Sequence, residues 1–123
     1  MELDKLTHEI LDAAYIVHTA LGPGLLESAY KACLVYELKQ KRFGVEVEKT
    51  TPLIYKDVNL DYGYRIDILV ESQVVVELKT VEQFKDVHVA QILTYMKLSN
   101  TRVGLLLNFH TKSLRDGIKR VVL

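Results

Sequence analysis

The spacing of apolar residues predicts two helices in the first third of the chain. Apolar residues recur every three or four positions over residues 6–21 and again over residues 25–41. We expect Thr7 to cap the first helix and the Gly-Pro-Gly segment at 22–24 to separate the two. His18 lies off the apolar stripe of the first helix, so its side chain is expected to face solvent.

The rest of the chain alternates between strand and helix patterns. Several apolar runs predict antiparallel strands, and Pro52 favours a bulge or an edge position among them. A helix at 87–98 precedes a continuous apolar run at 103–109, which is typical of a parallel strand covered on both faces. This order predicts one α/β domain (α+β layers) over residues 1–123, in which helices flank a mixed sheet.

Two of the apolar runs carry charges where a buried strand should have none. Residues 65–70 and 74–79 flank three polar residues and predict an antiparallel hairpin. With a three-residue connection, Asp67 stands opposite Glu77 at a cross-strand distance of about 5 Å, and Lys79 shares the face of Glu77. A two-residue connection would move Asp67 to the other face.

Paired carboxylates on a half-buried sheet repel each other and lose hydration. A bound divalent cation would make the pair of Asp67 and Glu77 favourable, and oxygen-only ligands favour Mg²⁺ or Mn²⁺ over zinc. The alternative is a plain ion network with Lys79. Such networks suit strand ends better than a valine-rich interior.

Polar residues on two predicted helices can reach this hairpin. Glu27 either interacts with its helix dipole or leans over the sheet toward Asp67. His88, Gln91 and Tyr95 fall within about 60° of one another on the third helix, as either a solvated edge or part of a site. The neighbouring, apolar side of that helix is predicted to comprise Val87, Ala90, Thr94 and Leu98.

Composition limits the function classes. Sixteen basic and sixteen acidic residues cancel, so binding to nucleic acid must come from a local patch rather than from net charge. A single cysteine, Cys33, excludes an internal disulfide and favours a cytoplasmic protein. No long apolar run or signal-peptide pattern is present, so no membrane association is expected.

The order of these motifs resembles the PD-(D/E)XK nuclease superfamily and, more closely, the small bacterial and archaeal proteins called the GxxExxR family. The resemblance spans most of the chain. Tyr30 stands where the GxxExxR motif ends in Arg, and Ile66 stands where the superfamily name has Pro. The matching stretches are GPGLLESAY (22–30), YRIDILV (64–70), VVVELKTVE (74–82), HVAQILTYMK (88–97) and VGLLLNF (103–109).

The resemblance implies a restriction-endonuclease-like fold and a phosphodiesterase centre that uses Mg²⁺ or Mn²⁺ to cut DNA or, less favoured, RNA, as an endo- or exonuclease. It implies that Asp67 and Glu77 hold the metal, with Glu27 as a further ligand, direct or through water. Lys79 would orient or activate water and offset negative charge, and Gln91 would position water or phosphate beside it. The substrate-binding residues implied in this way are Tyr95, His88 and Arg65. Tyr95 would also support Gln91.

A second interpretation stays open. The chain is small and has no net charge, so it offers little surface for a long polyanion. A catalytically inactive nuclease-fold module that binds nucleic acid or a protein partner fits these properties, and a homodimer is one way to provide more surface.

Overall fold

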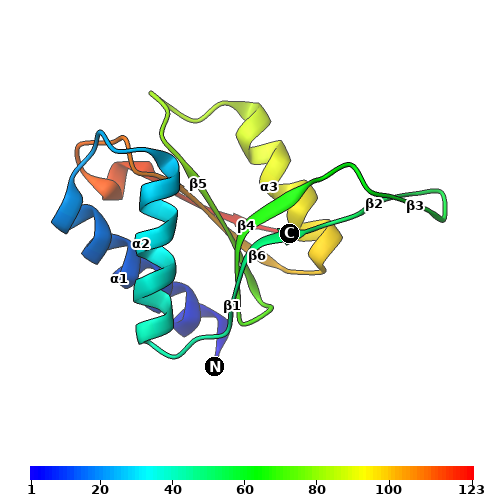
Figure 1. Ribbon diagram of the computed structural model, residues 1–123, viewed down its shortest axis with the longest axis horizontal. Coiled ribbons are helices and arrows are strands. Elements are labelled where there is room, and N and C mark those ends of the chain that lie inside the picture. The colour runs from blue at the N-terminus through cyan, green and yellow to red at the C-terminus, as the bar shows by residue number, and fades with distance from the viewer.

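The computed structural model describes residues 1–123 as a mixed sheet with helices on both faces, as the sequence predicts (Figure 1). The elements in chain order are α1 (Leu3–Leu21), α2 (Glu27–Gln40), β1 (Val45–Thr50), β2 (Leu53–Tyr55), β3 (Val58–Leu60), β4 (Arg65–Val70), β5 (Val74–Lys79), α3 (Asp86–Ser99), β6 (Val103–Asn108), the 3₁₀ turn η1 (Leu114–Gly117) and β7 (Ile118–Val122). No helix combines the length and the apolar character needed to cross a membrane.

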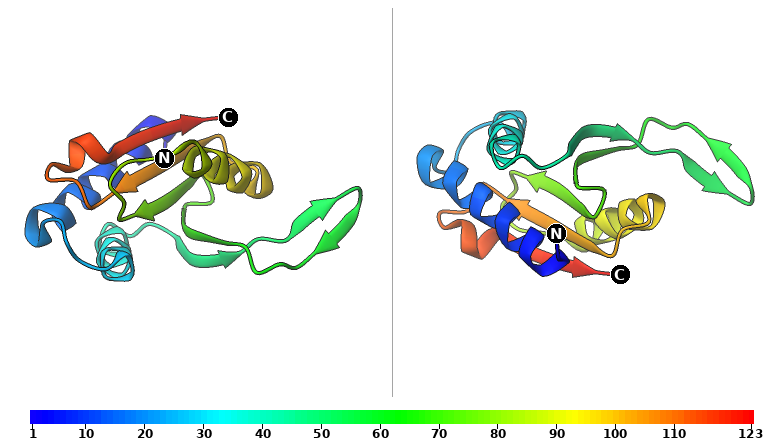
Figure 2. Two further views of the ribbon diagram at one scale, coloured as in Figure 1. Left: turned by 90° about the horizontal axis from the view of Figure 1, so that it is seen from above. Right: turned by 90° about the horizontal axis from the view of Figure 1, so that it is seen from below.

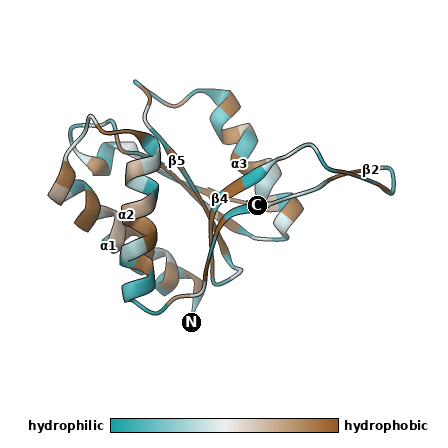
Figure 3. Cartoon of the chain, in the orientation of Figure 1, coloured by the Kyte–Doolittle hydropathy of each residue, from teal (hydrophilic) through white to brown (hydrophobic).

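The main sheet has the order β1-β4-β5-β6-β7, and its central strands are predominantly apolar (Figure 3). Only β5 and β6 run parallel, because α3 forms the crossover between them. Helices α1 and α2 pack on one face through the larger of two buried clusters, and α3 packs on the other face (Figure 2). The sheet therefore presents one side of β5 to α2 and the other to α3.

Helix α1 begins one turn earlier than its sequence suggests. Thr7 does not cap it, because the Thr7 hydroxyl lies inside the helix and donates to the Leu3 carbonyl at 2.9 Å. His18 was expected in solvent but is 8% exposed, and its Nε2 lies 2.9 Å from the carbonyl oxygen of Thr111. The segment after β6 covers this histidine, and the periodicity of α1 alone could not predict that contact.

Helix α3 also buries a different side from the one predicted. Its buried residues are Ile92, Tyr95 and Met96, whereas Val87, on the predicted apolar side, is 65% exposed. Gly104 of β6 lies beneath this side of α3, and because it has no side chain, Ile92 and Met96 pack directly on the sheet. This rotation brings the row of Gln91 and Tyr95 toward the sheet.

The turn between α1 and α2 is held by Tyr30. Gly22 and Gly24 have φ angles of 66° and 105°, which a residue with a Cβ adopts only with strain. The Tyr30 hydroxyl donates to the Gly22 carbonyl and accepts from the Leu25 N–H, and its ring stacks on Phe109 at 4.7 Å. Tyr30 thereby fixes the point at which α2 begins.

Strands β2 and β3 form a separate two-stranded arm that projects from the sheet (Figures 1 and 2). Pro52 separates β1 from β2, which belong to different sheets, whereas the sequence pattern predicts a bulge or an edge position there. Lys56 and Asp57 turn the arm with positive φ angles of 47° and 67°, which suit the right-handed twist of a tight hairpin.

Candidate functional site

The β4–β5 hairpin has the predicted register, and it ends at the point where the charged residues begin. The three-residue connection is residues 71–73, and the paired positions are Val70 with Val74, Leu69 with Val75 and Ile68 with Val76. Beyond Ile68 and Val76, β4 continues to pair with β1, and β5 continues to pair with β6. The two strands therefore separate, and Asp67 and Glu77 lie at the start of the opening.

Asp67 marks a rotation of β4. Ile68 belongs to the cluster under α1 and α2, but Ile66 belongs to the cluster under α3, although residues two apart on a regular strand share a face. On β1, Glu48 has a φ of 49° and forms no strand pair with Asp67. Because of this rotation, the Asp67 side chain reaches the backbone of β5 instead of following the regular alternation.

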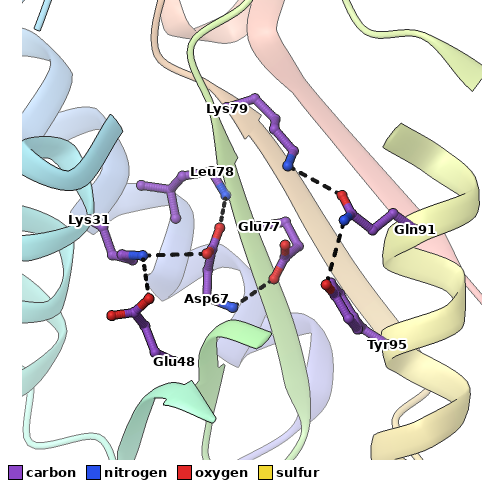
Figure 4. Close-up of polar contacts among 8 residues, drawn as sticks. All are labelled: Lys31, Glu48, Asp67, Glu77, Leu78, Lys79, Gln91 and Tyr95. Carbon is purple, nitrogen blue, oxygen red and sulfur yellow. Dashed lines mark hydrogen bonds and ion pairs between the residues drawn. The ribbon is translucent and has the colours of Figure 1, made fainter. Parts of the chain in front are cut away.

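The two carboxylates are joined crosswise through backbone groups (Figure 4). The N–H of Asp67 donates to Glu77 Oε2 at 2.8 Å, and the N–H of Leu78 donates to Asp67 Oδ2 at 2.9 Å. These two bonds take the place of the backbone–backbone hydrogen bonds between β4 and β5, which end one residue earlier, at the pair of Ile68 and Val76. The two acids are thus linked through backbone groups at the opening between the strands, although Asp67 does not share the face of Glu77 that simple alternation predicts.

Burial and neighbouring charge make Glu77 the most perturbed acid of this group. Glu77 is only 3% exposed, and this burial, reinforced by the charge of Asp67, raises its pKa to about 8. Lys79 opposes the shift, and Glu27 adds to it. Burial also raises the pKa of Glu27, with a further contribution from Asp67, so carboxylates from α2, β4 and β5 lie within electrostatic range of one another.

A chain of hydrogen bonds leads from β5 to α3 (Figure 4). Lys79 Nζ donates to Gln91 Oε1 at 3.3 Å, and Gln91 Nε2 donates to the Tyr95 hydroxyl at 3.5 Å. Burial raises the pKa of Tyr95, and the charges of Glu77 and Asp67 raise it further. The structure therefore brings Gln91 and Tyr95 to Lys79, on the side of the sheet that α3 covers.

Two of the residues considered from the sequence are not part of this network. His88 Nδ1 accepts from the backbone N–H of Lys85 at 2.9 Å, and its ring lies edge-on to Phe84, so it contributes to the start of α3. Arg65 begins β4, is exposed, and forms no side-chain hydrogen bond or ion pair.

The sequence did not reveal two charged residues that complete the cluster. Lys31 Nζ lies 3.5 Å from Asp67 Oδ1 and 3.5 Å from Glu48 Oε1 (Figure 4). Lys31 follows Glu27 by four residues and so shares its helix face, which was an available signal. The position of Glu48 depends on its positive φ angle, which no local pattern predicts for a glutamate.

The donor atoms of this cluster are of the kind that a hard cation prefers. Carboxylate oxygens suit Mg²⁺, and a buried acid with a raised pKa gains most from a neighbouring positive charge. No group of three or more histidine, cysteine, aspartate or glutamate side chains is placed to hold a metal ion. Mg²⁺ commonly keeps several waters and takes only one or two carboxylates, which the pair of Asp67 and Glu77 can supply.

The mixed sheet and its flanking helices have the architecture of restriction-endonuclease-like domains. A family model described as the PD-(D/E)XK nuclease superfamily matches residues 4–121, so the chain belongs to this superfamily. Nucleases of this superfamily typically use a divalent metal, and membership implies nucleic acid as a partner. Neither a curated protein nor a solved structure matches the chain.

Proposed function

We propose that residues 1–123 form a single nuclease-like domain that hydrolyses phosphodiester bonds with Mg²⁺ or Mn²⁺, with DNA favoured over RNA. The observation that carries this proposal is the environment of Glu77. A carboxyl group that is 3% exposed and has a pKa of about 8 lies next to a second carboxylate and two residues before a lysine. Such perturbed acids are concentrated at sites of chemistry or cation binding.

Each residue has a role that its surroundings support. Asp67 and Glu77 would hold the metal, and Glu27 would contribute directly or through water. A bound Mg²⁺ supplies charge neutralisation at the phosphate and lowers the pKa of its water. The Lys79 ammonium would offset negative charge on the reacting phosphate. Gln91 holds that ammonium in place.

Within the superfamily, we propose a relationship to the GxxExxR family on the basis of Gly24 and Glu27. Tyr30 replaces the final arginine of that motif. Its hydroxyl bonds to the Gly22 carbonyl and the Leu25 N–H, so this position supports the turn that precedes Glu27.

The test is cleavage of linear, circular and branched DNA, and of RNA, in Mg²⁺, Mn²⁺ or EDTA. Asp67→Asn, Glu77→Gln and Lys79→Ala are each expected to abolish cutting. Glu46→Gln is the matched control, because Glu46 lies on β1 and pairs only with Lys49 in an exposed ion pair. Cutting that survives all three substitutions would remove this proposal.

A second candidate is a nuclease-fold module that has kept the fold and lost the chemistry, binding nucleic acid or a protein partner, alone or as a homodimer. The observation that favours it is the use of Asp67 and Glu77 oxygens by backbone N–H groups, without a third acid placed for a metal. Calorimetric titration with Mn²⁺ separates the candidates. The inactive module predicts no heat of binding and no cleavage, whatever the oligomeric state measured by light scattering.

A further inference from the structure

A hollow of about 210 Å³ lies beside the cluster, between the base of the β2–β3 arm and α3. Two of the residues that line it, Gln91 and Tyr95, also form the hydrogen-bonded chain to Lys79. The hollow therefore adjoins the candidate active site directly. The residues that line it are Leu53, Tyr64, Gln91, Thr94, Tyr95 and Leu98.

The chemistry of this lining does not favour a phosphate subsite. It contains no lysine or arginine, so nothing in it would offset a negative charge. Instead, Tyr64, which is 46% exposed, lines the hollow together with the apolar side chains of Leu53 and Leu98. Gln91, Thr94 and Tyr95 add a few hydrogen-bonding groups.

An aromatic ring with apolar walls and a few polar atoms suits a flat heterocycle that carries its own donors and acceptors. A nucleobase has this chemistry. Inside a duplex both faces of a base are covered by neighbouring base pairs, so stacking on a protein ring requires a base that is single-stranded or displaced from the duplex.

We propose that the hollow binds an unpaired nucleobase next to the phosphate that is cut, so that the substrate is single-stranded or locally opened at the site. This inference rests on the proposed nuclease function and names its substrate class. The neutral net charge of the chain agrees with it, since stacking adds affinity without a basic surface. Tyr55 and Tyr62, which are 59% and 70% exposed, lie along the same segment that forms the β2–β3 arm and its return to β4. They provide two further aromatic rings on which bases could stack.

The test measures binding of the full chain in EDTA to oligonucleotides that contain the fluorescent base 2-aminopurine. A single strand is expected to bind more tightly than a duplex of the same sequence, and stacking is expected to quench the fluorescence. Tyr64→Leu should weaken single-strand binding at least about fivefold and remove the quenching. Tyr64→Phe, which keeps the ring, should retain both, and this pair of variants separates stacking from folding.

Tyr36→Leu is the matched control, because Tyr36 is 60% exposed on α2 and lines a different hollow between α1 and α2. If the chain cuts DNA but Tyr64→Leu binds single strands as the parent does, the inference is overturned and the nuclease stands. Equal affinity for single and double strands also overturns it. If nothing is cut but Tyr64→Leu still loses single-strand binding, the base-binding hollow stands and the nuclease proposal falls.

Discussion

Lys31 and Asp67 lie 3.5 Å apart, from Nζ to Oδ1, although they come from α2 and β4. This contact joins the helical layer to the sheet at the point where β4 leaves β5. Both side chains are largely buried, at 16% and 17% exposure, so water screens their attraction less than at an open surface. Lys31 is the only cationic side chain in direct contact with Asp67.

Replacing Lys31 with methionine is therefore expected to lower the free energy of unfolding of the metal-free protein by about 1 kcal/mol. Mg²⁺ should then stabilise the variant more than it stabilises the parent, because the cation meets carboxylates without a competing ammonium. Denaturant titrations with and without Mg²⁺ measure both effects. Lys49→Met is the control, since the Lys49–Glu46 pair is 40% and 46% exposed. Equal losses in the two variants would contradict this expectation.

The raised pKa of Glu77 makes the stability of the metal-free protein depend on pH. The folded state keeps a proton on Glu77 up to a pKa of about 8, whereas the unfolded chain releases it near 4.5. Stability from this group is therefore complete below pH 4.5 and is lost as the pH rises toward 8. Denaturation in EDTA across this range measures the slope. Glu77→Gln, which cannot titrate, should flatten it, and an unchanged slope in that variant would assign it to another group.

Lys79 offers a test of chemistry that leaves the fold intact. Its Nζ forms one hydrogen bond, to Gln91 at 3.3 Å, so Lys79→Gln is expected to keep the stability of the parent within about 0.5 kcal/mol. Cleavage should fall by about a hundredfold or more, because the positive charge near the phosphate is removed. Initial rates at saturating Mg²⁺ measure the loss. A rate within a few fold of the parent would exclude Lys79 from the reaction.

Tyr30 carries a prediction about the entry to α2. Tyr30→Phe removes the hydroxyl that bonds the Gly22 carbonyl and the Leu25 N–H, at a fully buried site. We expect a loss of about 1–2 kcal/mol in the free energy of unfolding. Mn²⁺ binding should also weaken, because the turn that fixes Glu27 is loosened. Tyr36→Phe, at 60% exposure, should change neither quantity.

Gly104 links the core to the position of α3. A Cβ added there would lie 2.7 Å from Met96 Sδ and 2.9 Å from Ile92 Cδ1, so the ends of these two buried side chains must shift. Gly104→Ala is expected to cost about 1–3 kcal/mol. It should also reduce cleavage by displacing Gln91. Val87→Ala, on the exposed side of α3, is the control for both measurements.

The sequence predicted those parts of the fold that depend on local pattern. The hairpin register follows from two apolar runs and a three-residue connection, and the structure pairs Val70 with Val74 accordingly. The parallel strand β6 and its crossover helix α3 follow from a continuous apolar run after a helical one.

What the sequence could not predict depends on contacts between distant elements. His18 is buried by the segment after β6, and Ile92 and Met96 of α3 pack over Gly104, which comes from the following strand. Asp67 was expected to point to the same face as Glu77 by simple alternation. Instead β4 rotates at this residue, opposite the positive φ angle of Glu48, and strand periodicity carries no sign of such a rotation.

The crosswise bonds of Asp67 and Glu77 also have an evolutionary consequence. Each carboxylate accepts a hydrogen bond from a backbone N–H at the point where the two strands separate. Selection for a folded sheet, even without selection for activity, is therefore expected to retain both acids. A descendant that has lost its chemistry would keep these acids, while Lys79, which holds no backbone group, would be free to drift. Among related sequences, we therefore expect the identity of residue 79, rather than the presence of the acidic pair, to distinguish active proteins from inactive ones.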